Sequence, residues 1–173
     1  GAGLGDEMFD VLSLYDSLNG AIGTVGLPWY NTVGNHDLNY DSPDNELSTE
    51  TFQRVFGPTY YAFDYGRVHF IVLNDVIYHG QKVGGYHGEL TPVQLEFVKN
   101  DLAHVSKDRL VVIAMHIPLV DVKNREELYR LIEDRPYTLS FSAHVPAPTM
   151  GESPTRPKRL LVRPPVLVAA ARL

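Results

Sequence analysis

Four apolar segments of this chain lead directly into side chains that can bind a metal ion. The segments and the residues that follow them are 2–5 with Asp6, 27–33 with Asn35, His36 and Asp37, 110–115 with His116, and 137–143 with His144. In open α/β sheets, ligands bind beyond the carboxyl ends of the strands. The pattern therefore predicts an α/β protein in which these side chains converge at one end of the sheet.

Helical patterns alternate with the apolar segments. The expected helices cover residues 10–19 with Asp10 as the N-cap, residues 48–56, the stretch from Thr91 to Val105, and a stretch that begins at Asn124. Thr91 followed by proline and then by Gln94 is a capping-box start. Residues 60–65 and 68–73 read as a hairpin, and residues 74–90 as a glycine-rich loop. We therefore expect a layered α/β fold with helices on a mixed sheet.

Each of these motifs also has a structural interpretation. Gly34, Asn35 and Asp37 are residue types that are common in turns, so the second motif could be a polar turn. A single histidine after an apolar run is often a structural residue. Four apolar segments in succession that end in such residues favour a metal site over separate structural roles. Tyr86 and His87 in the glycine-rich stretch could contact a substrate, or they could be ordinary surface residues.

On these residues the chain resembles the calcineurin-like metallophosphoesterases. The matching motifs are Gly5-Asp6 with Asp10, Gly34-Asn35-His36-Asp37, Met115-His116-Ile117-Pro118 and Ser142-Ala143-His144. The resemblance covers residues 1–144. It implies a partial metallophosphoesterase domain, built as an α/β sandwich of mixed sheets. It also implies metal-dependent hydrolysis of a phosphomonoester or phosphodiester.

The resemblance also implies roles for individual residues. The implied ligands of a divalent metal (Mn, Fe or Zn) are Asp6, Asn35, His116 and His144. His36 would protonate the leaving oxygen or stabilise the transition state, and Asp37 would orient His36. Oxygen and imidazole ligands suit several divalent metals, so the motif does not select one of them.

The sequence departs from the family pattern at two places. The family has an Asp-x-His element well before Gly5-Asp6, but only five residues precede Asp6 here. The family also has a second histidine where this sequence has Pro146. By this comparison one metal site is retained where the intact family has two, and the sandwich is incomplete. A non-catalytic phosphoesterase-like binding module is therefore the alternative function, and an artefactual reading frame is a third.

Residues 145–173 differ in composition from the rest of the chain. They contain six of the twelve prolines and five basic residues against a single acid, Glu152. We expect this basic, proline-rich tail to be irregular or non-native, as a shifted reading frame would produce. The alternative is a genuine proline-rich tail that binds a partner.

Composition narrows the function classes. The 173 residues carry a net charge of −6, which argues against a general nucleic-acid surface. The chain has no cysteine, so thiolate ligands and disulfides are excluded. No apolar run approaches the ~18 residues that a transmembrane helix requires. The expected partner is a phosphorylated small-molecule or macromolecular substrate, and the sequence indicates neither an oligomeric state nor a compartment.

Overall fold

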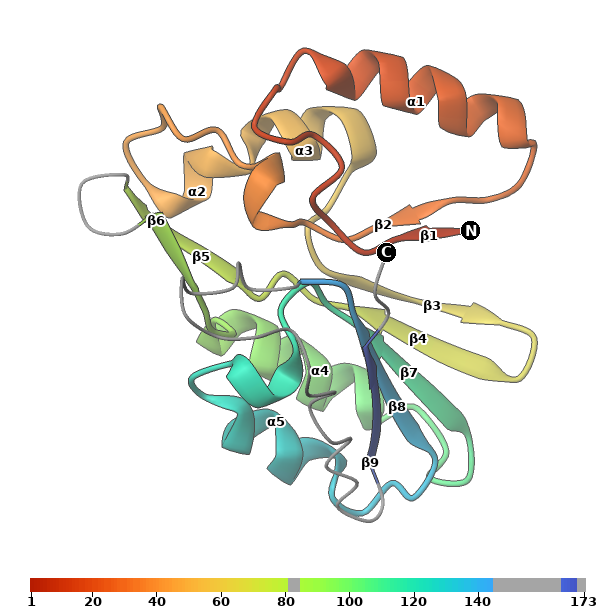
Figure 1. Cartoon of the computed structure of the whole chain (residues 1–173). Helices are drawn as coiled ribbons and strands as arrows, with labels where there is room; N and C mark the ends of the chain where they lie inside the picture. The colour runs from red at the N-terminus through yellow and green to blue at the C-terminus, as the bar shows by residue number, and fades with distance from the viewer. Residues whose placement is uncertain (81–84, 145–165, 171–173) are drawn as a thin grey trace, which may run out of the picture.

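The computed structural model describes residues 1–80 and 85–144 and the backbone of 166–170. Its largest sheet has five strands (Figure 1). Its strand order is β3-β4-β7-β8-β9. The bounds are β3 (Tyr61–Tyr65), β4 (Val68–Val72), β7 (Leu110–Ala114), β8 (Thr138–Ser142) and β9 (Val166–Ala170). β3 and β4 are antiparallel, whereas the other neighbouring strands are parallel. The predicted mixed sheet and the 60–73 hairpin are thus confirmed.

Two helices cover one face of this sheet (Figure 1). Helix α4 (Pro92–Leu102) leads into β7, and α5 (Arg125–Ile132) connects β7 to β8. Thr91 accepts a hydrogen bond from the backbone N–H of Gln94, as the capping motif predicts. Apolar side chains at helical spacing on α4 and α5 belong to one buried cluster with residues of β4 and β7. The buried residues of this contact are Ile71, Leu95, Val98, Leu102, Val111, Ile113, Leu128 and Ile132.

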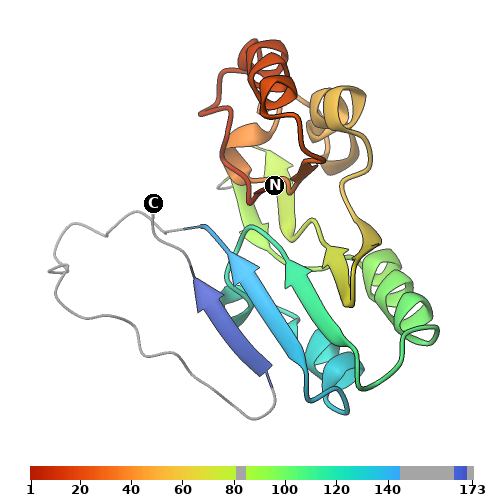
Figure 2. The same ribbon diagram turned by 90° about the vertical axis from the view of Figure 1, so that its right-hand side faces the viewer.

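A second, smaller layer lies beyond the carboxyl ends of the parallel strands (Figure 2). In it, β1 (Ala2–Gly3) pairs in parallel with β2 (Tyr30–Asn31). Helices α1 (Leu14–Val25), α2 (Asn45–Ser48) and α3 (Glu50–Phe56) accompany these strands. Tyr15 and Phe52 pack edge to face and fill the interior of this layer.

Two expected helices of the smaller layer are present with other bounds than predicted. The first helix does not begin at Asp10 but at Leu14, because Phe9 and Asp10 have positive φ values of 49° and 64° that a helix start does not tolerate. It also continues through Gly20 to Val25, where Gly26 has the left-handed conformation that ends a helix. The expected 48–56 helix is divided at Thr49 into α2 and α3.

The glycine-rich stretch 74–90 is not simply a loop. It contains an antiparallel pair of strands, β5 (Val76–Gly80) and β6 (Gly85–Gly88). Tyr78 and Tyr86 lie opposite each other in this pair. Its glycines disguise the alternating β pattern, since glycine is depleted in strands.

The predicted tail lies mostly outside the described residues, which exclude 145–165 and 171–173. Pro146, at the position of the family's second histidine, is among the residues outside the described part. Within the tail, the apolar residues 166–170 form strand β9 and extend the sheet in parallel beside β8. In the part of the chain that the structure describes, no helix has the length and apolar character of a membrane span.

Candidate metal centre

The four side chains predicted to bind metal come together where the two layers meet. Asp6 follows β1, Asn35 follows β2, His116 follows β7 and His144 follows β8. Donor atoms of Asp6, His116 and His144 all lie within 4.8 Å of one another. Among the described residues, these three side chains form the one cluster of ionisable groups that could hold a metal ion.

His116 is the centre of this cluster. Its Nε2 atom lies 3.0 Å from Asn35 Oδ1, 3.0 Å from His144 Nδ1 and 3.2 Å from Asp6 Oδ1. Adjacent ligands of a six-coordinate metal ion with bonds of about 2.1 Å are separated by about 3 Å. The separations around His116 therefore match those of ligands around one cation.

The tautomer of His116 fits the same conclusion. Its Nδ1 lies 2.8 Å from the carbonyl oxygen of Leu4, which can only accept a hydrogen bond, so Nδ1 carries a proton. In the neutral ring Nε2 then presents a lone pair to the carboxylate, the amide oxygen and the second imidazole. A ring held through its other nitrogen by a backbone carbonyl is the usual arrangement of a metal-binding histidine. The residues thus fit a divalent metal.

The charges of the cluster act on both histidines. Burial lowers the pKa of His116, but the hydrogen bond and the negative charge of Asp6 outweigh it and raise the pKa above its ordinary value. Burial, together with the charge of His116, lowers the pKa of His144. Asp6 thus favours a proton on His116, and the positive charge of His116 disfavours one on His144.

Glycines allow the strand ends to approach so closely. A Cβ atom on Gly34 would lie 2.1 Å from the backbone nitrogen of Asp6, and one on Gly5 would lie 2.6 Å from Nδ1 of His116. Asp6 itself has a φ of 65°, which costs an L-residue about 1–2 kcal/mol. Such strain is characteristic of functional sites, where the surrounding structure enforces it.

Asp37 does not have the partner that was predicted for it. Its carboxylate accepts hydrogen bonds from the backbone N–H groups of Asp6, Met8 and Gly34, at 2.9, 2.9 and 2.7 Å. These three bonds occupy a buried carboxylate, and they hold the segment that carries Asp6 against the one that carries Asn35. The idea that Asp37 orients the His36 ring is therefore corrected.

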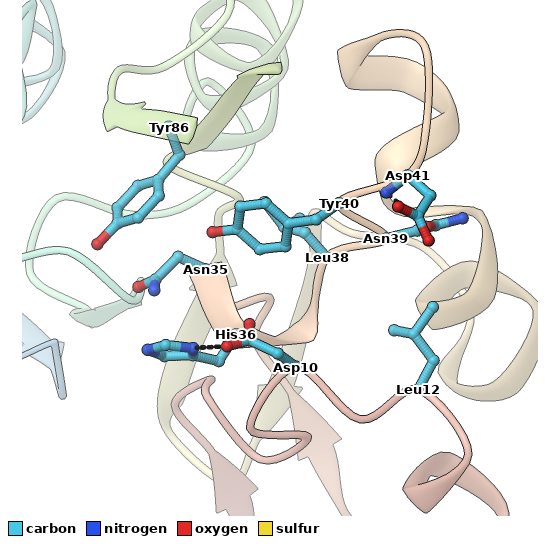
Figure 3. Close-up of a pocket in the computed structure, with 9 residues that line it drawn as sticks. All are labelled: Asp10, Leu12, Asn35, His36, Leu38, Asn39, Tyr40, Asp41 and Tyr86. Atoms are coloured by element: carbon cyan, nitrogen blue, oxygen red, sulfur yellow. Dashed lines mark hydrogen bonds and ion pairs between the residues drawn. The ribbon is translucent and has the colours of Figure 1, made fainter. Parts of the chain in front are cut away.

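Asp10 is the residue that orients His36. Its Oδ2 lies 2.8 Å from Nδ1 of His36, and both side chains are about half exposed. Because a carboxylate only accepts, Nδ1 carries the proton and Nε2 points away from Asp10 (Figure 3). The backbone N–H of Asp10 also donates to the carbonyl oxygen of His36, at 2.9 Å. The motif match contained Asp10, but its helical context suggested a cap instead.

Asp75 holds the backbone that carries His116. It is completely buried, and its carboxylate accepts the backbone N–H groups of His116 at 3.1 Å and Ile117 at 3.0 Å. Burial raises its pKa to about 7, although these hydrogen bonds act in the opposite direction. Sequence reasoning placed Asp75 in a loop and missed this contact, because its partners lie more than 40 positions away.

Glu7 is a buried acid next to the cluster. Its Oε2 is buried without a hydrogen-bond partner among the described residues. Burial, followed by the negative charges of Asp37 and Asp6, raises the pKa of Glu7 to about 7 from an ordinary value of 4.5. The folded protein therefore prefers this acid protonated, whereas the unfolded chain ionises it at lower pH.

We expect Glu7→Gln to stabilise the metal-free protein at pH 8. Between pH 4.5 and about 7 the unfolded state releases the Glu7 proton and the folded state retains it, so rising pH favours unfolding. The full difference is on the order of 3 kcal/mol above pH 7, and it vanishes below pH 4.5. Urea unfolding in EDTA at pH 4.5 and 8 measures it. Glu127→Gln, on an exposed residue of α5, is the control, and equal pH dependence in Glu7→Gln and the parent would contradict the assignment.

A cavity of about 580 Å³ opens beside the cluster (Figure 3). Asn35 and His36 belong to its wall, so the cavity borders the candidate metal ligands directly. The other lining residues are Asp10, Leu12, Leu38, Asn39, Tyr40, Asp41 and Tyr86. Its size is within the range of small-molecule sites. Of the two residues that could contact a substrate by sequence, Tyr86 lines this cavity and His87 is not among its lining residues.

The layered fold and this donor set define an α/β protein of the metallophosphoesterase type. The sequence pattern of the calcineurin-like phosphoesterase family matches residues 4–148, and the chain belongs to this family. The resemblance seen in the sequence is thereby confirmed.

Among solved structures, the chain is similar to a purple acid phosphatase, PPD1, isolated from yellow lupin (Lupinus luteus) seeds. The two are 18% identical, with a TM-score of 0.62, and the match covers 83% of this chain and 30% of that one. At this identity the likeness shows a shared fold. A comparison with curated proteins found no match.

Proposed function

We propose that this protein is a metal-dependent phosphoesterase that acts on a phosphomonoester or a phosphodiester. The observation that carries the proposal is the environment of His116, whose Nε2 has three donor atoms at 3.0–3.2 Å. Membership of the calcineurin-like phosphoesterase family supports it. The cavity beside the cluster supplies room for the substrate.

The proposed ligands are Asp6, Asn35, His116 and His144, and the donor types suit Mn, Fe or Zn. When bound there, such an ion would polarise the phosphoryl group and lower the pKa of water. Asp37 and Asp75 keep the ligands in place by binding the backbone on either side of the site. Glu7 adds negative charge next to Asp6 when it is ionised, which favours a cation at the site.

His36 is the proposed acid of the reaction. In the doubly protonated imidazolium form of His36, Asp10 accepts the Nδ1 proton, and the second proton, on Nε2, is the one given to the leaving oxygen. His36 also lies in the cavity wall, where it can reach a bound ester. General acid help of this kind contributes about 10²- to 10⁴-fold to a rate.

A second candidate is a module that binds phosphorylated ligands without hydrolysing them. It is favoured by one observation: the described residues supply one metal-binding group, where the resemblance implies two metals. The two functions share the ligand set and differ in turnover.

Metal loading followed by an activity assay tests both functions. We expect the full chain, stripped and then titrated with Mn²⁺ or Zn²⁺, to bind metal and to hydrolyse p-nitrophenyl phosphate or its bis ester. Saturable hydrolysis supports the enzyme. Metal-dependent binding of phosphate by calorimetry, without hydrolysis, supports the module. A chain that binds no metal by elemental mass spectrometry contradicts both.

A further inference from the structure

Two tyrosines line the cavity on the side of the candidate metal ligands. In Figure 3 the rings of Tyr40 and Tyr86 both have their hydroxyl ends towards Asn35. The rings themselves extend away from that residue, where a group attached to a bound phosphoryl group would lie. His36, the proposed acid, is in the same wall.

Both rings are held by the surrounding structure. The Tyr78 hydroxyl donates to the carbonyl oxygen of Tyr40 at 2.6 Å. The rings of Tyr40 and Tyr78 pack edge to face with centroids 5.5 Å apart. Tyr86 lies opposite Tyr78 in the β5–β6 pair, and its ring packs edge to face on His144 at 6.0 Å. Aromatic walls that are fixed before binding lose little conformational freedom when a ligand enters.

The charges of the cavity restrict what it accepts. The hydroxyl groups of Tyr40 and Tyr86 can each donate a hydrogen bond. The described lining residues include the acids Asp10 and Asp41 and no lysine or arginine. The further phosphates of a substrate with several phosphates would lie beside these acids with no lysine or arginine to pair with them.

We infer that the substrate is an ester of one phosphoryl group with a planar aromatic group, such as an aryl or nucleoside phosphate. Tyr40 and Tyr86 flank the aromatic group, and their hydroxyls face the phosphoryl oxygens. The acceptors Asp41 and Asn39 suit hydroxyl or amino substituents on it. This inference rests on the proposed function, because it places the phosphoryl group at the metal ligands.

Phosphonates separate ring recognition from leaving-group chemistry, because they are not hydrolysed. With Mn²⁺-loaded protein, we expect calorimetry to show phenylphosphonate binding about tenfold tighter than methylphosphonate. Tyr40→Ala and Tyr86→Ala should each remove most of this preference. Tyr40→Phe keeps the ring and should keep the preference. Tyr65→Ala, on an exposed residue of β3, is the matched control and should leave it unchanged.

Three results would overturn the inference. Equal affinity for the two phosphonates excludes aromatic recognition but leaves the proposed function intact, since the phosphonate group still binds. A preference that survives in both alanine variants shows that other residues cause it. If neither phosphonate binds to the metal-loaded protein, the proposed function fails together with the inference.

Discussion

Replacing His116 with alanine should strongly weaken metal binding. Nε2 of His116 is the atom that contacts all three other proposed ligands, at 3.0–3.2 Å. Loss of an outer partner of a metal ligand typically costs about 10- to 100-fold in metal affinity, and loss of a central ligand costs more. We therefore expect the affinity of His116→Ala for Mn²⁺ or Zn²⁺ to fall by more than about 100-fold, as measured by calorimetry and by elemental mass spectrometry after gel filtration.

The control for this experiment is His104→Ala. His104 is exposed just after α4, so its removal takes away an imidazole without touching the cluster. Because His116 is buried, the variant also needs a test of folding, which circular dichroism and urea unfolding in EDTA supply. Parent-like metal affinity in a folded His116→Ala protein would disprove the ligand assignment. A loss of affinity that His104→Ala shares would attribute the binding to surface histidines.

Much of the fold follows from local sequence patterns. The apolar run before His116 forms β7, and the run before His144 contains β8, because a short apolar segment that leads into a polar residue suits a buried parallel strand. The capped start of α4 at Thr91 is a local hydrogen-bond pattern and was predictable for that reason. The β5–β6 pair was missed because its three glycines conceal the strand pattern.

The candidate site was predictable as a set of residues but not as a network. Strand ends identify Asp6, Asn35, His116 and His144, because parallel strands direct their carboxyl ends to one edge. Two of the three partners of Asp37 lie 29 and 31 positions earlier, and Asp10 reaches His36 across 26 positions. No spacing rule distinguishes these two carboxylates, so their roles were assigned wrongly from sequence. Only the three-dimensional arrangement separates the acid that holds the backbone from the acid that holds the imidazole.

Replacing His36 with alanine should lower turnover by about 10²- to 10⁴-fold and leave metal content unchanged. Its ring is outside the His116 cluster, and only its backbone N–H contacts a proposed ligand, Asp6, at 2.9 Å. The alanine variant keeps that backbone bond. The measurement is kcat for phenyl phosphate, with metal content determined on the same sample. A His36→Ala protein that loses its metal would show that the ring acts as a ligand and not as an acid.

The leaving group decides whether His36 acts by giving a proton. A 2,4-dinitrophenolate departs without protonation, whereas phenolate needs it, so the loss in His36→Ala should be much smaller for 2,4-dinitrophenyl phosphate than for phenyl phosphate. Asp10→Asn should reproduce a weaker form of the same pattern, because it removes the charge that holds the Nδ1 proton of His36 at 2.8 Å. Asp16→Asn, on an exposed residue of α1 outside the cavity, is the control. Equal losses for both esters would assign His36 to binding the phosphoryl group, and the proton would then have to come from elsewhere in the site.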